Sequence, residues 1–245
     1  LGAHILSIVN VVGSSISRES DQVLYTWAGP EIAVATTKAY TTQLALLSLL
    51  ALWMAQQLGT VSEEDCRAML SAFQELPGKM EEVLSHRDSI QYFAAQYFNH
   101  NSIFFIGRNL DYALGLEGSL KLKEISYIHS EAYASGELKH GTISLIEDGT
   151  LVVALGTYGT LFAKAMSNVV EVKARGADVL ALTTANHREE MSHTADAVMV
   201  IPDIHDLLLP SLGVVPLQLF AYYVALMRGC DIDKPRNLAK SVTVE

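Results

Sequence analysis

Short apolar runs alternate with longer stretches of helical periodicity along this chain. The apolar runs, rich in β-branched residues, predict strands at residues 3–11, 23–27, 103–106, 151–155, 179–183 and 197–201. Apolar positions three and four apart predict helices at residues 36–57, 112–129, 160–174 and 210–228. The more polar residues 60–101 predict two or three shorter helices, with Ser62 and Asp65 as a capping box and Pro77 inside the stretch. Strands that alternate with helices indicate an α/β fold around a mostly parallel sheet.

Part of this pattern occurs twice. Residues 3–59 and residues 178–229 each follow the order strand, polar turn, short strand, acidic connection and long apolar helix. In each copy an aspartate precedes a glutamine of the long helix by 22 positions, namely Asp21 before Gln43 and Asp196 before Gln218. Such self-similarity is typical of a duplicated structural unit.

The two copies differ in what precedes them. A front half, residues 103–175, comes before the second copy, whereas the first copy has none, and parallel strands need sheet partners and crossover connections. We therefore expect the missing half upstream of Leu1, in a longer polypeptide. The expected units are the C-terminal part of a first domain at 1–59, a second domain at 60–229 and a C-terminal tail at 230–245.

Composition excludes several classes of function. Half of the residues are hydrophobic (50%), which is enough for a sizeable core. The net charge is −10, without a cluster of Lys or Arg, so the basic surface that nucleic-acid binding requires is missing. The longest apolar run, residues 44–54, is about half as long as a bilayer span, and we predict no membrane segment.

The cysteines and histidines predict neither a disulfide nor a metal site. Cys66 and Cys230 are lone thiols without a CxxC spacing, which suits a reducing compartment. The histidines are scattered and lack metal-ligand spacing. We therefore expect a cytoplasmic protein that uses no metal and no other cofactor.

Ionisable side chains are densest in residues 117–141, inside an apolar stretch that is compatible with a helix. Lys121 and Glu124 are three positions apart on one predicted helix face, where they could form an ordinary surface ion pair or belong to a site. After a turn at Ser135, His140 is expected to be exposed and titratable. Together these groups could transfer protons, although the residues alone do not identify a substrate.

Three segments resemble one enzyme family. They are EISYIHSEAYASGELKHG at residues 124–141, PEIAVATTKAYTTQ at 30–43 and PRNLAKSVTVE at 235–245. In this order and spacing, over essentially the whole chain, they resemble the isomerase part of glutamine–fructose-6-phosphate aminotransferase. The resemblance implies two tandem sugar isomerase (SIS) domains, each a five-stranded parallel sheet between helices, followed by a C-terminal tail.

The resemblance also implies an activity and partners. Fructose 6-phosphate would react with ammonia to give glucosamine 6-phosphate, and an N-terminal glutaminase domain of the same polypeptide would release that ammonia from glutamine. The enzyme would be a homodimer, because the family's ring-opening histidine reaches into the site of the neighbouring subunit.

Site residues follow from matching positions. Glu124 resembles the base that moves a proton between C1 and C2, His140 the ring-opening histidine, and Lys240 the lysine beside the substrate carbonyl. The positions that resemble substrate contacts are Lys121, Val34, Thr36 and Ala239.

These residue types suit the implied reaction. Moving a proton between adjacent carbons needs a group that takes it and returns it, which a carboxylate in a water-poor site can do. An amine near a ketone can form an iminium or polarise the oxygen. Imidazole titrates near neutrality and can carry the ring-opening proton.

The chain departs from the family pattern in several places. Thr142 stands where the family has proline, and Thr36 where members often have serine. The family's phosphate-binding turn, of the form SQSGET, does not occur, and GTYGT at 156–160 is interpreted as a strand-to-helix turn. We therefore expect the 245-residue chain alone to bind fructose 6-phosphate weakly and to be inactive. A non-catalytic SIS module that binds a sugar phosphate for regulation is the alternative function.

Overall fold

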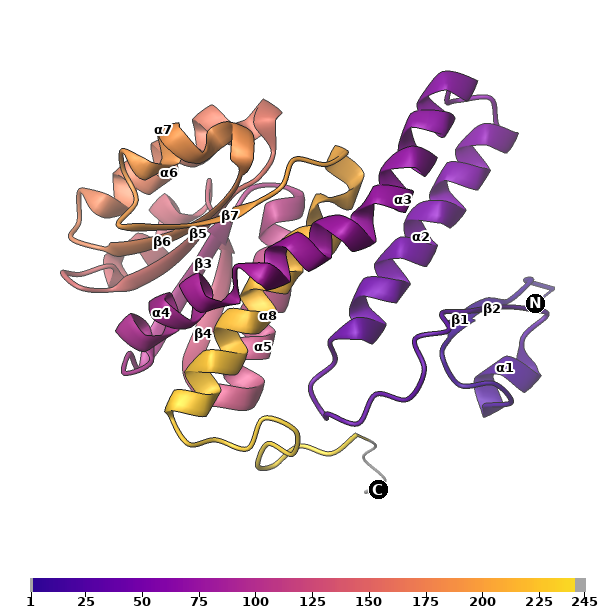
Figure 1. Cartoon of the computed structure of the whole chain (residues 1–245), viewed down its shortest axis with the longest axis horizontal. Helices are drawn as coiled ribbons and strands as arrows, with labels where there is room; N and C mark the ends of the chain where they lie inside the picture. The colour runs from indigo at the N-terminus through magenta and orange to yellow at the C-terminus, as the bar shows by residue number, and fades with distance from the viewer. Residues whose placement is uncertain (1, 241–245) are drawn as a thin grey trace.

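A five-stranded parallel sheet forms the centre of the protein, in a computed structural model that describes residues 2–240. Its strand order is β4-β3-β5-β6-β7 (Figure 1). The strands are β3 Ser102–Gly107, β4 His129–Ala134, β5 Leu151–Gly156, β6 Asp178–Thr184 and β7 Ala197–Ile201. Four of them lie within one residue of the predicted bounds, and β4 was not predicted.

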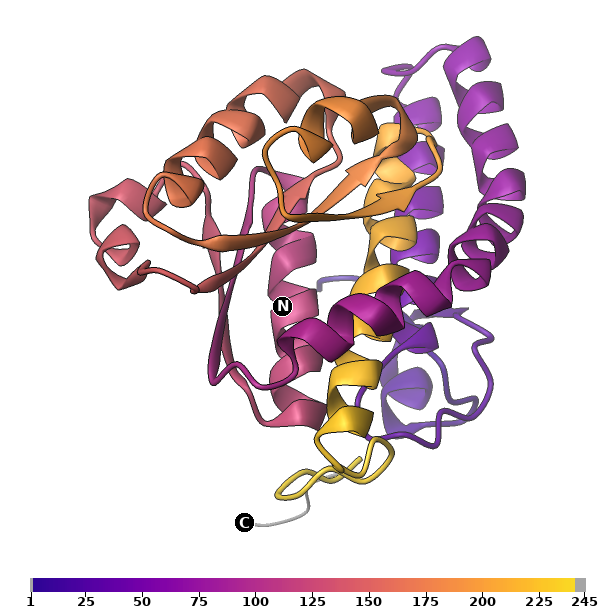
Figure 2. The ribbon, with the colours of Figure 1, turned by 60° about the vertical axis from the view of Figure 1, so that its left-hand side comes forward.

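Helices cover both faces of this sheet (Figures 1 and 2). On one face lie α4 Arg87–Tyr97, α5 Leu110–Ser126 and α8 Leu209–Met227. On the other face lie α6 Phe162–Lys173 and α7 Arg188–Ser192. Short 3-10 helices are η1 Leu138–His140, η2 Thr142–Leu145, η3 Gly159–Leu161, η4 Ala185–His187 and η5 Asp206–Leu208. The predicted α/β architecture is confirmed.

Alternate side chains of each strand enter two separate core layers. In β3, Ile103 and Phe105 pack toward α5 and α8, whereas Phe104 and Ile106 pack toward α6. Because both faces are covered, β3, β5, β6 and β7 are largely apolar rather than alternating, which is why they could be recognised as continuous runs.

Helix α8 is the most apolar helix and forms much of one core layer. The helical segment Asp206–Met227 is long and apolar enough to cross a membrane, but 67% of its most apolar window is buried inside the protein. This burial is the property of a core helix, which packs against α4 and α5 in the described residues.

An antiparallel pair, α2 Lys38–Gln57 and α3 Glu63–Ser85, precedes the sheet. The predicted capping box is confirmed, since Ser62 Oγ accepts a hydrogen bond from the backbone N–H of Asp65 at 3.0 Å. Pro77 does not end a helix: it lies on the exposed side of α3, while Leu76 and neighbouring apolar residues are buried along the other side. Packing of this face outweighs the hydrogen bond that proline removes, and the break between α3 and α4 falls at His86.

The helix predicted at 112–129 ends earlier and buries a different face. Tyr127 has a left-handed conformation (φ 62°), which terminates α5 and directs the chain into the edge strand β4. Leu116 and Leu120, whose spacing of four fits the predicted helix, are 47% and 40% exposed. The buried face is formed instead by Leu114, Gly115, Gly118, Ser119, Lys121, Leu122 and Ile125.

The N-terminal strands form a small sheet of their own. β1 Leu6–Val9 and β2 Gln22–Tyr25 pair in parallel and are connected by the short helix α1 Ser15–Glu19, which was not predicted. The expectation of a buried strand at 3–11 is wrong for this chain, since no residue of β1 is buried. The reason is that β1 pairs with β2 alone.

The same kind of hydrogen bond occurs next to each of the strand pairs β1–β2 and β6–β7. Asp21 Oδ2 accepts a hydrogen bond from the backbone N–H of Ile5 at 2.8 Å, and Asp196 Oδ2 accepts one from Val179 at 2.7 Å. In each case a long apolar helix follows, α2 or α8, and ends at a glycine with positive φ.

Candidate active site

Lys121 is the centre of a buried ionic cluster in the last turns of α5. It is only 3% exposed, and its Nζ lies 2.7 Å from Glu124 Oε2 and 3.4 Å from Glu117 Oε1. The shorter contact is an ionic one without good hydrogen-bond geometry, because Glu124 Oε2 has no well-aligned donor in the described part of the chain. The spacing correctly placed Lys121 and Glu124 together, but the pair is not on the protein surface.

Burial makes the carboxylate next to this lysine unusual. Burial raises the pKa of Glu117, although the attraction of the Lys121 ammonium opposes the increase. Across the cluster, burial and then the charge of Glu117 raise the pKa of Tyr40 in α2 to about 12. The first turns of α2 therefore lie within electrostatic reach of the end of α5.

Residues 31–37 and the C-terminal tail meet although they are about 200 positions apart in the sequence. Lys240 Nζ donates a hydrogen bond to the carbonyl oxygen of Ala33 at 2.8 Å and lies 3.4 Å from Glu31 Oε2. The backbone N–H of Val34 donates to the carbonyl oxygen of Asp233 at 2.9 Å. Two of the three segments that carried the family resemblance are thus in direct contact.

Glu31 links the start of α2 to the tail. Its Oε1 accepts hydrogen bonds from the Thr37 backbone N–H at 2.7 Å and from Thr37 Oγ1 at 3.0 Å, while Oε2 faces Lys240. Burial alone would raise the pKa of Glu31, but the hydrogen bonds from Thr37 and the charge of Lys240 outweigh it and lower the pKa. Glu31 therefore remains an anion that holds the tail lysine.

Two hollows lie beside this cluster. Lys121 lines one of about 220 Å³ together with Ala33, Thr37 and Gln218, whose buried Nε2 finds no acceptor in the described residues. Glu124 lines the other, of about 450 Å³, whose remaining lining is Leu120, Lys123, Tyr127, Arg236, Asn237 and Leu238. The two charges of one ion pair thus face separate spaces, and both spaces include residues that follow α8.

His140 lies far from this cluster. It follows β4, and Ala134 at the end of β4 pairs with Gly107, immediately before the start of α5. Glu124 is at the other end of α5, so about 20 Å of helix separates the two regions. His140 is exposed, as expected, but within one chain it cannot reach Glu124.

The other predicted positions fall near the tail contact. Thr36 is partly exposed within residues 31–37, and Ala239 is exposed next to Lys240. Glu117, Glu31, Tyr127 and Arg236 were not predicted as site residues. Glu117 could have been found from its spacing of four to Lys121. The other three make contacts between distant segments, which no local pattern reveals.

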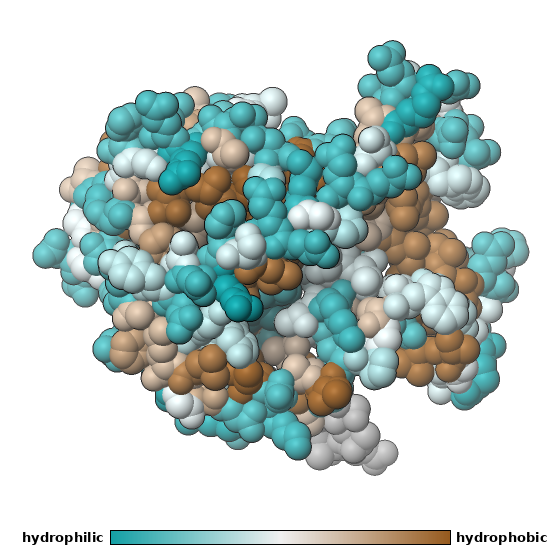
Figure 3. Space-filling view, in the orientation of Figure 1, coloured by the Kyte–Doolittle hydropathy of each residue, from teal (hydrophilic) through white to brown (hydrophobic). Residues whose placement is uncertain are grey.

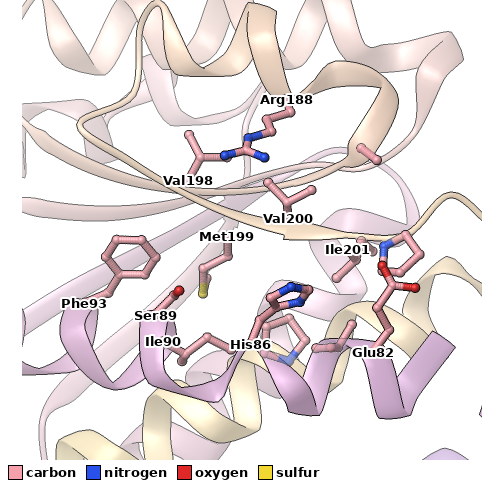
Figure 4. A pocket seen from close by; sticks show the side chains of 14 residues that line it. Glu82, His86, Ser89, Ile90, Phe93, Arg188, Val198, Met199, Val200 and Ile201 are labelled. Carbon is pink, nitrogen blue, oxygen red and sulfur yellow. The ribbon is translucent and has the colours of Figure 1, made fainter. Parts of the chain in front are cut away.

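A different cavity, of about 410 Å³, contains none of these residues. It lies between α3, α4 and the edge strand β7, with Glu82, His86 and Arg188 around an apolar floor (Figure 4). Among residues 2–240, no group of three or more His, Cys, Asp or Glu side chains is arranged to hold a metal ion.

A buried carboxylate connects the segments that follow β3 and β5. Helices leave these two neighbouring strands toward opposite faces, which in parallel sheets is the usual place for a ligand. Here Asp111, only 3% exposed, accepts hydrogen bonds from the Thr157 backbone N–H at 2.9 Å and from Thr157 Oγ1 at 2.5 Å. The GTYGT turn therefore binds an internal carboxylate, in agreement with its interpretation as a structural turn.

Comparisons with known proteins agree with the resemblance. The family model described as SIS domain matches residues 1–53 and 96–228. Glutamine–fructose-6-phosphate aminotransferase (isomerizing) of Clostridium acetobutylicum is 55% identical over 245 residues, all of this chain and 40% of the relative. The enzyme of the same name from Thermococcus kodakarensis is 49% identical over 244 residues, again 100% of this chain and 40% of the relative. The chain thus spans about 40% of the length of these curated relatives.

Solved structures give the same picture. The C-terminal domain of glucosamine-fructose-6-phosphate aminotransferase from Francisella tularensis matches with a TM-score of 0.90 and 36% identity, over 94% of this chain and 65% of that one. Glucosamine-6-phosphate deaminase from Thermotoga maritima matches with a TM-score of 0.69 and 27% identity, over 97% of this chain and 66% of that one. The chain therefore belongs to the SIS domain family, and its resemblance to the C-terminal, isomerase part of glutamine–fructose-6-phosphate aminotransferase is confirmed over its whole length.

Proposed function

We propose that this chain is the isomerase portion of an enzyme that converts fructose 6-phosphate and glutamine-derived ammonia to glucosamine 6-phosphate. The observation that carries the proposal is the geometry at the end of α5. Glu124 is held by the buried Lys121 and faces a hollow lined by the tail, while Lys121 lines a second hollow with Ala33, whose carbonyl oxygen accepts a hydrogen bond from Lys240. The conversion of a ketose to an amino sugar needs a proton acceptor and an amine, the roles that we assign to Glu124 and Lys240.

Each residue has a distinct role in this proposal. Glu124 moves the proton between C1 and C2, and Lys240 leaves the Ala33 carbonyl to engage the substrate carbonyl. Lys121 lines the site and attracts the neighbouring carboxylates of Glu117 and Glu124. The further contacts to the sugar are Val34, Thr36 and Ala239.

The position of His140 supports a homodimer as the active form. His140 is exposed and about 20 Å from Glu124 along α5, so only a second copy could bring it to the site. We therefore propose that His140 of one protomer opens the sugar ring in the site of its partner.

The uncovered face of α2 supports two tandem SIS units, of which the first is incomplete in this chain. None of the twenty residues of α2 is buried, and Leu47, Trp53 and Met54 are 49–58% exposed. Figure 3 shows apolar side chains along this part of the molecule. By analogy with α8, we propose that upstream residues complete a sheet against α2 and supply the phosphate-binding turn. The proposed units are 1–59, 60–229 and a tail at 230–245.

The remaining partner is a glutaminase domain of the same polypeptide. Because the chain covers 40% of its relatives' length, such a domain has room in the full-length protein, called the parent below. We place the reaction in the cytoplasm, where phosphorylated sugars and reduced cysteines are found; both cysteines, Cys66 and Cys230, are free in the described structure.

Interconversion of fructose 6-phosphate and glucose 6-phosphate by the parent tests this function. We expect Glu124→Gln to lower the rate by roughly two to four orders of magnitude, because it removes the proton acceptor and keeps the shape. Lys164→Gln, at an exposed position of α6 on the other face of the sheet, is the control. Full activity of Glu124→Gln would refute the role of Glu124. A parent that binds fructose 6-phosphate without converting it would instead favour the regulatory SIS module.

A further inference from the structure

Tyr127 occupies a conformation that large side chains rarely adopt. It follows the last residue of α5 with φ 62° and ψ 15°, in the left-handed region where glycine usually ends a helix. A bulky residue persists there only when its surroundings hold it, and such residues concentrate at functional sites. Tyr127 lies three positions after Glu124 and lines the same hollow.

The side chain of Tyr127 holds the C-terminal tail in two ways. Its hydroxyl oxygen accepts a hydrogen bond from the backbone N–H of Arg236 at 2.8 Å. The guanidinium carbon of Arg236 lies 4.1 Å from the centre of the Tyr127 ring, within the range of a cation–π contact. The next residue, Asn237, is also left-handed (φ 63°), so the tail turns at this point.

This contact shortens the free part of the tail that carries Lys240. The preceding contact of the tail is the bond between Asp233 and Val34. From Asp233, the seven residues to Lys240 could extend to about 25 Å, whereas the four residues from Arg236 extend to at most about 14 Å. Lys240 is therefore confined near the end of α5, on the side where residues 31–37 accept its ammonium.

We propose that Tyr127 is a positioning residue that clamps the tail at Arg236 and thereby places the Lys240 amine for the reaction. The proposal rests on the proposed function of Lys240. It also couples the tail to Glu124, because the same helix end holds the carboxylate and the clamp. The hydroxyl and the ring of Tyr127 make separable contributions.

Tyr127→Phe in the parent tests the clamp without any activity measurement. It removes one oxygen and keeps the ring, so the fold should be unchanged. We expect the backbone amide of Arg236 to exchange with deuterium about fivefold faster, because a typical hydrogen bond has been lost. We also expect faster acylation of Lys240 relative to Lys164, an exposed lysine of α6, both measured by mass spectrometry.

The same variant tests the consequence for the reaction. For formation of glucosamine 6-phosphate from fructose 6-phosphate and ammonium, we expect kcat to fall about fivefold while KM for the sugar changes less than about twofold, because positioning acts on the reacting state. Arg236→Met should act in the same direction, since it removes the cation over the ring. Tyr92→Phe, an exposed tyrosine of α4, is the matched control.

Two results would overturn the proposal. One is unchanged exchange at Arg236 and unchanged acylation of Lys240 in Tyr127→Phe. The other is a change in both with kcat unaffected, since the clamp would then have no part in the reaction. A parent that forms no product at all contradicts the proposed function instead, and the exchange and acylation data would still decide whether Tyr127 holds the tail.

Discussion

Lys121 lies buried between two carboxylates, and its replacement by methionine removes the charge while keeping most of the side-chain shape. The side chains of Glu117 and Glu124 are only 13% and 22% exposed, and both depend on the same ammonium. The variant leaves two carboxylates close together in a poorly hydrated place, without a cation between them. We expect this to destabilise the folded protein strongly at neutral pH.

The distances set the size of the effect. At an effective dielectric constant of about 20, the Lys121 ammonium attracts the Glu124 carboxylate by about 6 kcal/mol at 2.7 Å and the Glu117 carboxylate by about 5 kcal/mol at 3.4 Å. Desolvation of the three groups and repulsion between the carboxylates offset most of this sum. Removal of one partner from a buried pair costs about 3–5 kcal/mol, so we expect a loss of about 3 kcal/mol at pH 7, since both carboxylates are partly exposed.

The loss should shrink as the pH falls. The pKa of Glu117 is already raised above its ordinary value of 4.5 by burial, and without Lys121 it rises further. A carboxyl group whose pKa is higher in the folded state than in the unfolded state destabilises the fold at high pH and does so less as pH falls through the raised pKa. The difference between wild type and Lys121→Met should therefore decrease from pH 7 toward 4.5.

Urea unfolding of the parent at several pH values measures this difference. Lys123→Met is the matched control, because it removes the same charge from an exposed position of α5 and should change stability by less than about 0.5 kcal/mol. Adding Glu117→Gln to Lys121→Met should restore about 1–2 kcal/mol by removing one unpaired carboxylate. Equal urea midpoints for Lys121→Met and Lys123→Met would refute the reasoning. So would a loss of stability in Lys121→Met that grows as the pH falls.

Two further predictions concern packing and pH. Gly118→Ala should destabilise the parent by about 1–3 kcal/mol, because its Cβ would lie 2.8 Å from Leu217 Cδ1 and 3.0 Å from Phe105 Cε1, both in buried side chains. Gly115→Ala is the control, since its Cβ would meet no atom closer than 3.5 Å; equal urea midpoints for the two variants would contradict the packing. The lowered pKa of Glu31 means that its stabilising contacts are present above pH 4.5 and are lost as pH falls below it. Glu31→Gln should thus lower the free energy of unfolding, measured with urea, by a constant amount of about 1 kcal/mol at pH 5–8 and by less in acid; a difference that grows below pH 4.5 would contradict this.

The strands that are buried on both faces could be predicted from the sequence, because their residues are mostly apolar. The strands β3, β5, β6 and β7 are largely apolar because helices cover both faces, and their bounds could be read within one residue. β4 was missed because it is an edge strand with polar residues such as His129 and Glu131, and because its sequence directly continues the helical spacing of α5.

The chain's own residues determined the α/β class, the repeated Asp and Gln positions and the proximity of Lys121 to Glu124, because neighbours within one helix or strand follow from its period. Only the tertiary structure decided that Lys121 is buried, that His140 lies at the opposite end of α5 and that Tyr127, Glu31 and Lys240 connect the tail to residues 31–37. The tail contacts join segments more than 100 positions apart, and all of these relations depend on how whole elements pack, which no local spacing encodes.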